Sequence, residues 1–193
     1  MRRTLFIIFL SLLGCNQLDD QVPAGTQLLR NSDISSPNSP QPWVSVTSPG
    51  FLLGMSRDEF RSASASLFIE SRDSTNIDPT TWRQTINSPL PREGQKLTLR
   101  AYLKGEEIKR FAPGSNVFIS LRAFPVEDSN GNTAGRYITS QERIIVDSTF
   151  TWRPIELVLN NMPPEVEYLV VYLAMAPRTS GKVYFDDITL TVD

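Results

Sequence analysis

Histidine is absent from this chain of 193 residues, and cysteine occurs once, as Cys15. The missing histidine removes the commonest general base, the usual member of a hydrolytic triad and the commonest zinc ligand. A lone cysteine has no partner for a disulfide and no companions for a cysteine-based metal site. These absences make catalysis the weaker hypothesis, and we expect that the protein is not an enzyme.

The chain also lacks a cluster of basic residues. It contains 19 lysines and arginines against 21 aspartates and glutamates, a formal charge of −2. Arg2 and Arg3 lie at the start, and without them 17 basic residues face 21 acidic ones, a charge of −4. Because phosphate binding depends on concentrated lysine and arginine, we do not expect nucleic acid as a partner.

The first 14 residues are typical of a signal peptide. The apolar run from Leu5 to Leu13 follows two arginines and is shorter than the ~20 residues that a bilayer requires. It ends in Leu12-Leu13-Gly14-Cys15, which resembles the lipobox of bacterial lipoproteins. The resemblance implies cleavage before Cys15, with lipid on its thiol and on the new amino terminus. The lipid would anchor the protein to a membrane.

The residue after the cysteine bears on the destination. It is Asn16, and the lack of an aspartate there favours the outer membrane over retention at the inner membrane. Residues 15–25 are polar, include a proline and a glycine, and predict a tether between the lipid and a folded domain. The remaining residues, 26–193, predict a single domain.

Short strand-like segments separated by turn residues fill this domain. They contain β-branched and aromatic residues, and several alternate between apolar and polar positions. The expected strands are Thr26–Arg30, Trp43–Thr47, Ser64–Glu70, Trp82–Asn87, Lys96–Lys104, Asn116–Phe124, Tyr137–Val146, Trp152–Leu159, Tyr168–Ala174 and Lys182–Val192. One possible helical turn spans Ser56–Ala63. About nine or ten such strands predict an all-β protein, an antiparallel β-sandwich or barrel.

The order of several motifs resembles the β-jelly-roll carbohydrate-binding modules of families 4, 9 and 22, whose sandwich is galactose-binding-like. The motifs are the Asn31-Ser32-Asp33 segment leading to Trp43, Ser64–Ile69, Trp82–Ile86, Glu93–Gly105, Thr151–Leu157 and the closing Val183–Leu190. The resemblance implies a jelly roll that binds a glycan without catalysis. It is less specific for sugar than for fold, because one sandwich can serve many ligands.

The closing strand carries two adjacent carboxylates. Strict alternation places Tyr184, Asp186, Ile188 and Leu190 on one face and Phe185, Asp187 and Thr189 on the other. Asp186 would then face the core, where it needs a cation or several hydrogen-bond donors. The resemblance implies a structural Ca²⁺ held by Asp186 with Asn31 and Asp33, although the family's usual glutamate is missing from this segment. The alternative is that backbone amides satisfy Asp186 and no metal binds.

The resemblance also implies a sugar site on the outward, concave face of one sheet. The positions that it implies are Gln84, Arg100, Tyr102, Arg122 and Tyr172. The alternative is an ordinary solvated or covered sheet face. Trp82 could belong either to this site or to the core, whereas Trp43 and Trp152 are expected in the core.

These observations predict a lipid-anchored binding module of the bacterial cell envelope that recognises a glycan or a glycan-bearing partner. A protein of a different class fits the same residues: a structural or protein-interaction lipoprotein with the same fold and no sugar site. A hydrolase is the third hypothesis, with little in the sequence to favour it.

Overall fold

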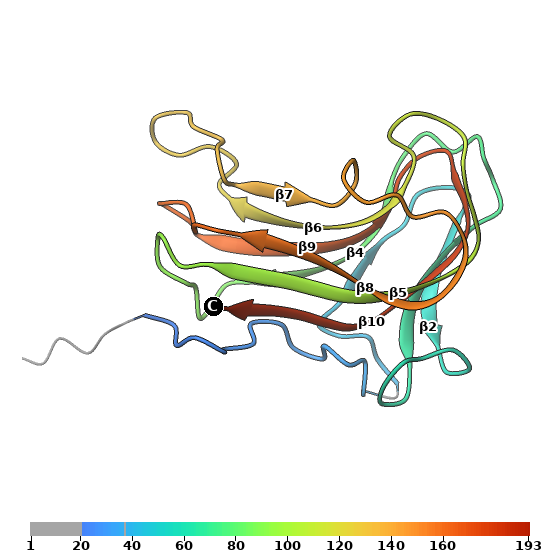
Figure 1. Cartoon of the computed structure of the whole chain (residues 1–193), viewed down its shortest axis with the longest axis horizontal. Helices are drawn as coiled ribbons and strands as arrows, with labels where there is room; N and C mark the ends of the chain where they lie inside the picture. The colour runs from blue at the N-terminus through green and yellow to red at the C-terminus, as the bar shows by residue number, and fades with distance from the viewer. Residues whose placement is uncertain (1–20, 37) are drawn as a thin grey trace, which may run out of the picture.

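Two antiparallel five-stranded sheets pack face to face in the computed structural model, which describes residues 21–36 and 38–193 (Figure 1). The β9 sheet has the order β1-β4-β9-β6-β7, and the β10 sheet has the order β2-β3-β10-β5-β8. The strands are β1 (Val44–Val46), β2 (Phe51–Ser56), β3 (Ser66–Ser71), β4 (Thr80–Ile86), β5 (Leu97–Arg110), β6 (Val117–Phe124), β7 (Tyr137–Thr139), β8 (Ser148–Leu159), β9 (Tyr168–Met175) and β10 (Thr179–Val192). The predicted antiparallel β-sandwich is confirmed.

Most expected strands are present, and the differences lie at the sheet edges and near the chain start. The segment Thr26–Arg30 forms only an isolated bridge, between Gln27 and Thr191. The edge strand β2 was not expected, because Phe51–Ser56 does not alternate cleanly. Strand β7 ends at Thr139, well before Val146. Residues 57–65 form no helix but a loop between β2 and β3, called the β2–β3 loop below.

The core lies between the sheets and is built from the alternation that the sequence displays. The inward positions Leu97, Leu99, Ala101 and Leu103 of β5 and Val117, Ile119, Leu121 and Ala123 of β6 are buried. Trp82 is buried as well, and its indole N–H donates to the carbonyl oxygen of Phe68 at 3.0 Å. Because β4 and β3 belong to different sheets, this hydrogen bond joins the two layers.

The N-terminal segment is held along the last strand. Strand β3 pairs with β10 only as far as Phe185, which leaves the end of β10 without a neighbour on that side. The N-terminal segment occupies this place (Figure 1): the amide of Leu28 donates to the Leu190 carbonyl at 2.8 Å, and the amide of Ile188 donates to the Ser32 carbonyl at 2.8 Å. The end of β10 thus obtains backbone partners on both sides.

Strand β10 does not keep strict alternation. Its register with β5 shifts between Asp186 and Thr189, where Asp187 has a φ of 47°. The shift is a β-bulge, in which one extra residue reverses the parity of the side chains that follow. Phe185 and Ile188 therefore both face the core, while Asp186 faces away from it. The prediction that Asp186 shares a face with Ile188 and Leu190 is wrong for this reason.

Candidate ligand-binding face

The residues expected to form one sugar platform lie on three different surfaces. Arg122 and Tyr172 point outward from the β9 sheet, in strands β6 and β9. Arg100 and Tyr102 point outward from β5 in the opposite sheet, so the sandwich separates them from the first pair. Gln84 belongs to the inward face of β4 and is buried. The expectation of a single platform is therefore wrong: two pairs lie on opposite outward faces, and Gln84 lies inside the sandwich.

Gln84 holds the N-terminal segment and is not exposed to a ligand. Its side-chain oxygen accepts a hydrogen bond from the Arg30 amide at 2.8 Å, and its side-chain nitrogen donates to the Arg30 carbonyl at 3.0 Å. With 2% of its surface exposed, it contributes to the fold. Trp82 lies two residues earlier on the same inward face, so of its two expected places, the sugar site or the core, it belongs to the core.

Arg100 and Tyr102 are occupied by neighbouring side chains. Arg100 forms an ion pair with Glu156 of β8 at 3.1 Å. The guanidinium group of Arg61, from the β2–β3 loop, stacks 3.7 Å above the ring of Tyr102 and pairs with the carboxylate of Asp187. The loop therefore covers this part of the β10 sheet.

The two carboxylates of β10 bind this same loop. One oxygen of Asp186 accepts from the backbone amides of Arg61 at 2.7 Å and Ser62 at 3.0 Å, and the other accepts from the Asp187 amide at 2.8 Å. Asp187 also accepts from the hydroxyl of Ser62. The bulge thus brings both carboxylates to one loop, although strict alternation would place them on opposite faces. Burial raises the pKa of Asp186 to about 6, against the opposing effect of the three amides.

These contacts do not suit the implied calcium set. The side-chain nitrogen of Asn31 donates to the carbonyls of Pro40 and Gln41, and Asp33 accepts from the Ser35 amide. Within the part of the chain that the structure describes, no group of three or more acidic, histidine or cysteine side chains is placed to hold a metal. Three backbone amides donate hydrogen bonds to Asp186, as expected if the carboxylate is satisfied without a metal. A structural calcium ion stays a prediction.

The outward face of the β9 sheet gathers aromatic rings around two arginines. The strand registers place Val44, Arg83, Tyr172, Ser120 and Thr139 in one row across the sheet, Thr85, Val170, Arg122 and Tyr137 in the next, and Tyr168 beside Phe124 in a third. Cross-strand neighbours of this kind lie about 5 Å apart. The sequence prediction had included only Arg122 and Tyr172 of these residues.

The rings on this face, called the β9 face below, contact one another. Phe124 and Tyr168 stack with centroids 4.8 Å apart and planes 8° from parallel. The Arg122 guanidinium lies 5.4 Å from the Phe124 centroid and 5.7 Å from that of Tyr137. Tyr137 remains 48% exposed. Flat, partly exposed rings beside a planar hydrogen-bond donor are groups suited to the C–H face and the hydroxyls of a sugar.

The charged side chains on the strands of the β9 face are all positive. None of the five strands of its sheet contains an aspartate or a glutamate. Arg83 and Arg122 form no ion pair with any carboxylate in residues 21–36 and 38–193. Burial raises the pKa of the Tyr172 hydroxyl, while the positive charges of Arg122 and Arg83 act to lower it.

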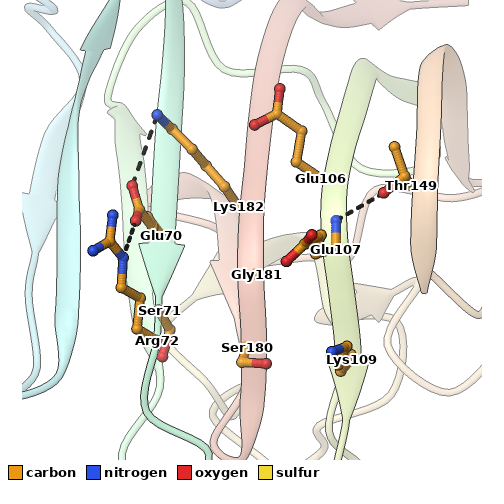
Figure 2. Close-up of a pocket in the computed structure, with 10 residues that line it drawn as sticks. All are labelled: Glu70, Ser71, Arg72, Glu106, Glu107, Lys109, Thr149, Ser180, Gly181 and Lys182. Atoms are coloured by element: carbon orange, nitrogen blue, oxygen red, sulfur yellow. Dashed lines mark hydrogen bonds and ion pairs between the residues drawn. The ribbon is translucent and has the colours of Figure 1, made fainter.

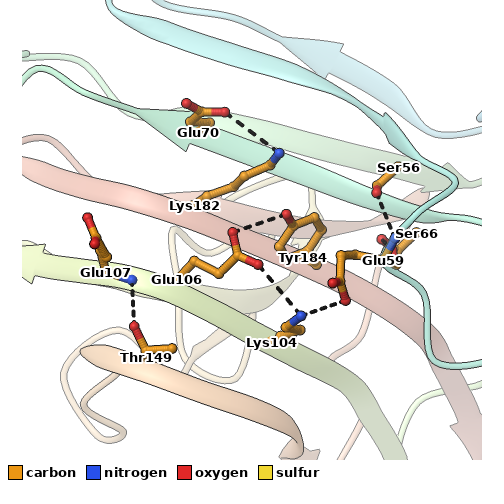
Figure 3. Close-up of polar contacts among 10 residues, drawn as sticks. All are labelled: Ser56, Glu59, Ser66, Glu70, Lys104, Glu106, Glu107, Thr149, Lys182 and Tyr184. Atoms are coloured by element: carbon orange, nitrogen blue, oxygen red, sulfur yellow. Dashed lines mark hydrogen bonds and ion pairs between the residues drawn. The ribbon is translucent and has the colours of Figure 1, made fainter.

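The opposite face differs because several of its charges are paired. Lys104 lies 2.5 Å from a carboxylate oxygen of Glu59 and 3.6 Å from one of Glu106, and the Tyr184 hydroxyl donates to Glu106 at 3.3 Å (Figure 3). Burial, together with the charge of Glu106, raises the pKa of Tyr184. Trp152 packs beside Tyr184 on this outward side, half-buried, so its expected place in the core is wrong.

A hollow of about 740 Å³ opens on the same side of the β10 sheet (Figure 2). Glu70 at its wall pairs with Arg72 at 2.8 Å and with Lys182 at 3.7 Å. Its floor contains Gly181, whose neighbour across the strands is Glu107. Since the charges here are largely used within the protein, we regard the β9 face as the better candidate for a ligand.

Comparison with known proteins agrees with the fold. No family model matches the chain, and no curated protein matches it by sequence. Solved structures do match. The enzymatically active domain of tailspike protein 4 of bacteriophage CBA120 has a TM-score of 0.61 at 14% identity over 86% of this chain, which spans 21% of that domain.

Two further structures match along nearly their whole length. The CBM22-1 xylan-binding domain of Paenibacillus barcinonensis Xyn10C has a TM-score of 0.60 at 11% identity, with 89% of this chain and 97% of that one covered. An apo cyclase from Fischerella sp. has a TM-score of 0.61 at 13% identity, with 87% and 96% covered. At such identities the likeness shows the fold, which carbohydrate-binding modules and enzymes share.

Strand register explains why the sequence prediction omitted Arg83, Tyr137 and Tyr168. Alternation within each segment places these three residues on the outward face of their own strand. Which residues of other strands lie beside them depends on the pairing of segments that are far apart in the sequence. A signal was nevertheless available. The segments that form the β9 sheet lack acidic residues, whereas those that form the β10 sheet contain several.

Proposed function

We propose that this protein is a lipid-anchored module of the bacterial cell envelope that binds a glycan, or a glycan-bearing partner, on the β9 face and catalyses no reaction. The observation that carries the proposal is the β9 face itself, where aromatic rings share one outward surface with two arginines that pair with no acidic side chain among the described residues. Such a surface offers stacking together with planar hydrogen-bond donors. The opposite face offers mostly groups that already bind one another.

The fold and the chemistry of the chain support a binding role. Its sandwich is shared with a xylan-binding domain, and the chain has no histidine to act as a general base. The two adjacent carboxylates, Asp186 and Asp187, are bound by the β2–β3 loop and are not available to flank a glycosidic bond. The cyclase and the tailspike domain show that this fold also occurs in enzymes, so absence of turnover is part of the proposal.

The anchor rests on the sequence alone. The expected signal peptide of residues 1–14, Cys15 and residues 16–20 of the expected tether lie outside the described residues. In the part of the chain that is described, no helix is long and apolar enough to cross a membrane. A lipid on Cys15 would provide attachment, and residues 16–21 would separate the β-sandwich from the membrane surface. The last residues of the expected tether pack against the sandwich: Val22 is buried in the core, and the Gly25 amide donates to the Val192 carbonyl at 2.7 Å.

A glycan array with matched variants tests the binding role. Tyr172→Ala and Arg122→Ala alter the β9 face, whereas Tyr102→Ala and Arg100→Ala alter the opposite one. We expect the first pair to weaken glycan binding by about 10-fold each, the magnitude of one lost stacking or charge-assisted contact. The second pair should leave the affinity unchanged.

Two results would overturn this proposal. Absence of binding to any glycan would favour the rival, a structural or protein-interaction lipoprotein. Equal losses from both pairs would place the site elsewhere or indicate a general loss of folding, which circular dichroism of each variant distinguishes. Turnover of a glycoside by the wild-type chain would instead favour an enzyme.

A further inference from the structure

The charge of the β9 face is opposite in sign to that of the whole chain. The chain has a formal charge of −2, yet the strands of the β9 sheet carry two arginines and no acidic residue. The strands of the β10 sheet, by contrast, include Glu70, Glu106, Glu107, Glu156, Asp186 and Asp187. Among the strand residues, the acidic side chains are thus confined to the sheet opposite the face that we assign to the ligand.

The two arginines flank one tyrosine. Arg83 lies directly opposite Tyr172 across the β4–β9 pair, and Arg122 lies on β6, on the other side of β9. Two strand spacings and an offset of two residues separate the arginine Cα atoms by roughly 12 Å. That span is longer than one pyranose ring, so the two guanidinium groups can meet successive or alternate units of an oligosaccharide whose rings lie along Tyr172 and Tyr137.

From this arrangement we infer that the ligand of the β9 face is an acidic glycan built from uronic acids, whose carboxylates pair with Arg83 and Arg122. The inference rests on the proposed function and specifies its ligand class. A guanidinium group matches a carboxylate with two parallel hydrogen bonds. In a uronic acid the carboxylate is attached directly to the pyranose ring. If the sugar ring stacks on Tyr172, its carboxylate projects from the edge of the ring toward the arginines on the two neighbouring strands.

Methyl esters provide the decisive comparison, because esterification removes the charge of a uronic acid and keeps its ring. Isothermal titration calorimetry of the full-length chain would use tetramers of galacturonate, glucuronate, mannuronate and guluronate, each beside its methyl ester. For at least one sugar we expect the acid to bind 10-fold or more tightly than the ester. Higher salt should reduce this difference, because the arginines are partly exposed.

Arginine variants test which residues cause the preference. Arg83→Gln and Arg122→Gln should each shrink the difference between acid and ester by about 10-fold, the size of one charge-assisted pair. Arg100→Gln, on the opposite face, is the matched control and should leave the difference unchanged. Dextran sulfate is included as an anion of a different kind.

The outcomes separate this inference from the proposed function. Neutral glycans that bind through Tyr172, with every acid no tighter than its ester, would overturn the inference and leave the function standing. Binding of dextran sulfate with no oligouronide bound would overturn the assignment to carboxylates. If no glycan binds, neutral or acidic, both proposals fail. A preference for the acid that survives both arginine substitutions would show that other residues cause it.

Discussion

The buried carboxyl of Asp186 should make the stability of this protein fall as the pH rises from 4 to 6. Asp186 has no exposed surface, and burial raises its pKa from the ordinary 3.8 to about 6. Well below pH 3.8, the carboxyl group is protonated in both the folded and the unfolded chain. Between pH 4 and 6 the unfolded chain releases the proton while the folded chain retains it, so ionisation favours unfolding.

The size of the effect follows from the two pKa values. A change from 3.8 to about 6 corresponds to a loss of up to about 3 kcal/mol in the free energy of unfolding, complete once the pH exceeds 6. Asp73, Asp128 and Asp193 have lowered pKa values, so their contributions are present above pH 3.8 and are lost only below it. The two effects therefore occupy different pH ranges.

Urea unfolding followed by tryptophan fluorescence measures this profile, because Trp43 and Trp82 are buried. EDTA is present throughout, so that no divalent cation can hold the carboxylate ionised. The side chain introduced by Asp186→Asn cannot titrate. In this variant the free energy of unfolding should therefore no longer fall between pH 4 and 6, whatever its overall stability. Asp187→Asn removes the neighbouring charge, leaves Asp186 buried, and should keep most of the slope.

Two observations would refute the reasoning about Asp186. The first is a wild-type stability that stays level or rises between pH 4 and 6, which would mean that the three backbone amides outweigh burial. The second is an Asp186→Asn variant with the wild-type slope, which would assign the pH dependence to another group.

Three further predictions concern the backbone, the metal and the anchor. Gly181→Ala should destabilise the fold by about 2–3 kcal/mol in urea unfolding, because φ is +107° and a Cβ atom would lie 2.6 Å from the Glu107 carbonyl oxygen. Gly94→Ala, with positive φ but open space around it, should cost only about 1 kcal/mol, and equal losses would contradict this account. EDTA should leave the melting temperature unchanged, because Asp186 already accepts three amides; a clear decrease would support the calcium site. Cys15→Ala should release the protein from membranes on fractionation, and a variant that stays membrane-bound would argue against lipid attachment.

Much of the fold could be predicted because it depends on local pattern. Alternation along Leu97–Leu103 and Val117–Ala123 identified both strands and their buried faces correctly. The edge strand β2 was missed because it is only half-buried and its pattern is weak. The prediction that Asp186 faces the core is wrong because a β-bulge at Asp187 reverses the alternation of side chains. The residues around Asp187 include no glycine or other residue type that would have predicted a bulge.

The candidate site could be predicted only in part, for a related reason. Tyr172 and Arg122 were correctly expected to point outward, but alternation cannot say to which of two sheets an outward residue belongs. Arg100 and Tyr102 fit the pattern equally well and lie on the opposite side of the sandwich. Gln84 has a polar side chain on an inward face, where it binds the backbone of a segment 54 residues earlier in the chain.

By itself the sequence determined the class of the fold, the buried faces of its main strands and the absence of histidine chemistry, because these depend on residue type and on spacing along one segment. Only the tertiary structure decided which residues meet. It brought Arg83, Tyr172 and Arg122 together on the β9 face and bound Asp186 and Asp187 to the β2–β3 loop. Both outcomes depend on strand order and on one bulge, which are set by pairings between segments distant in the chain.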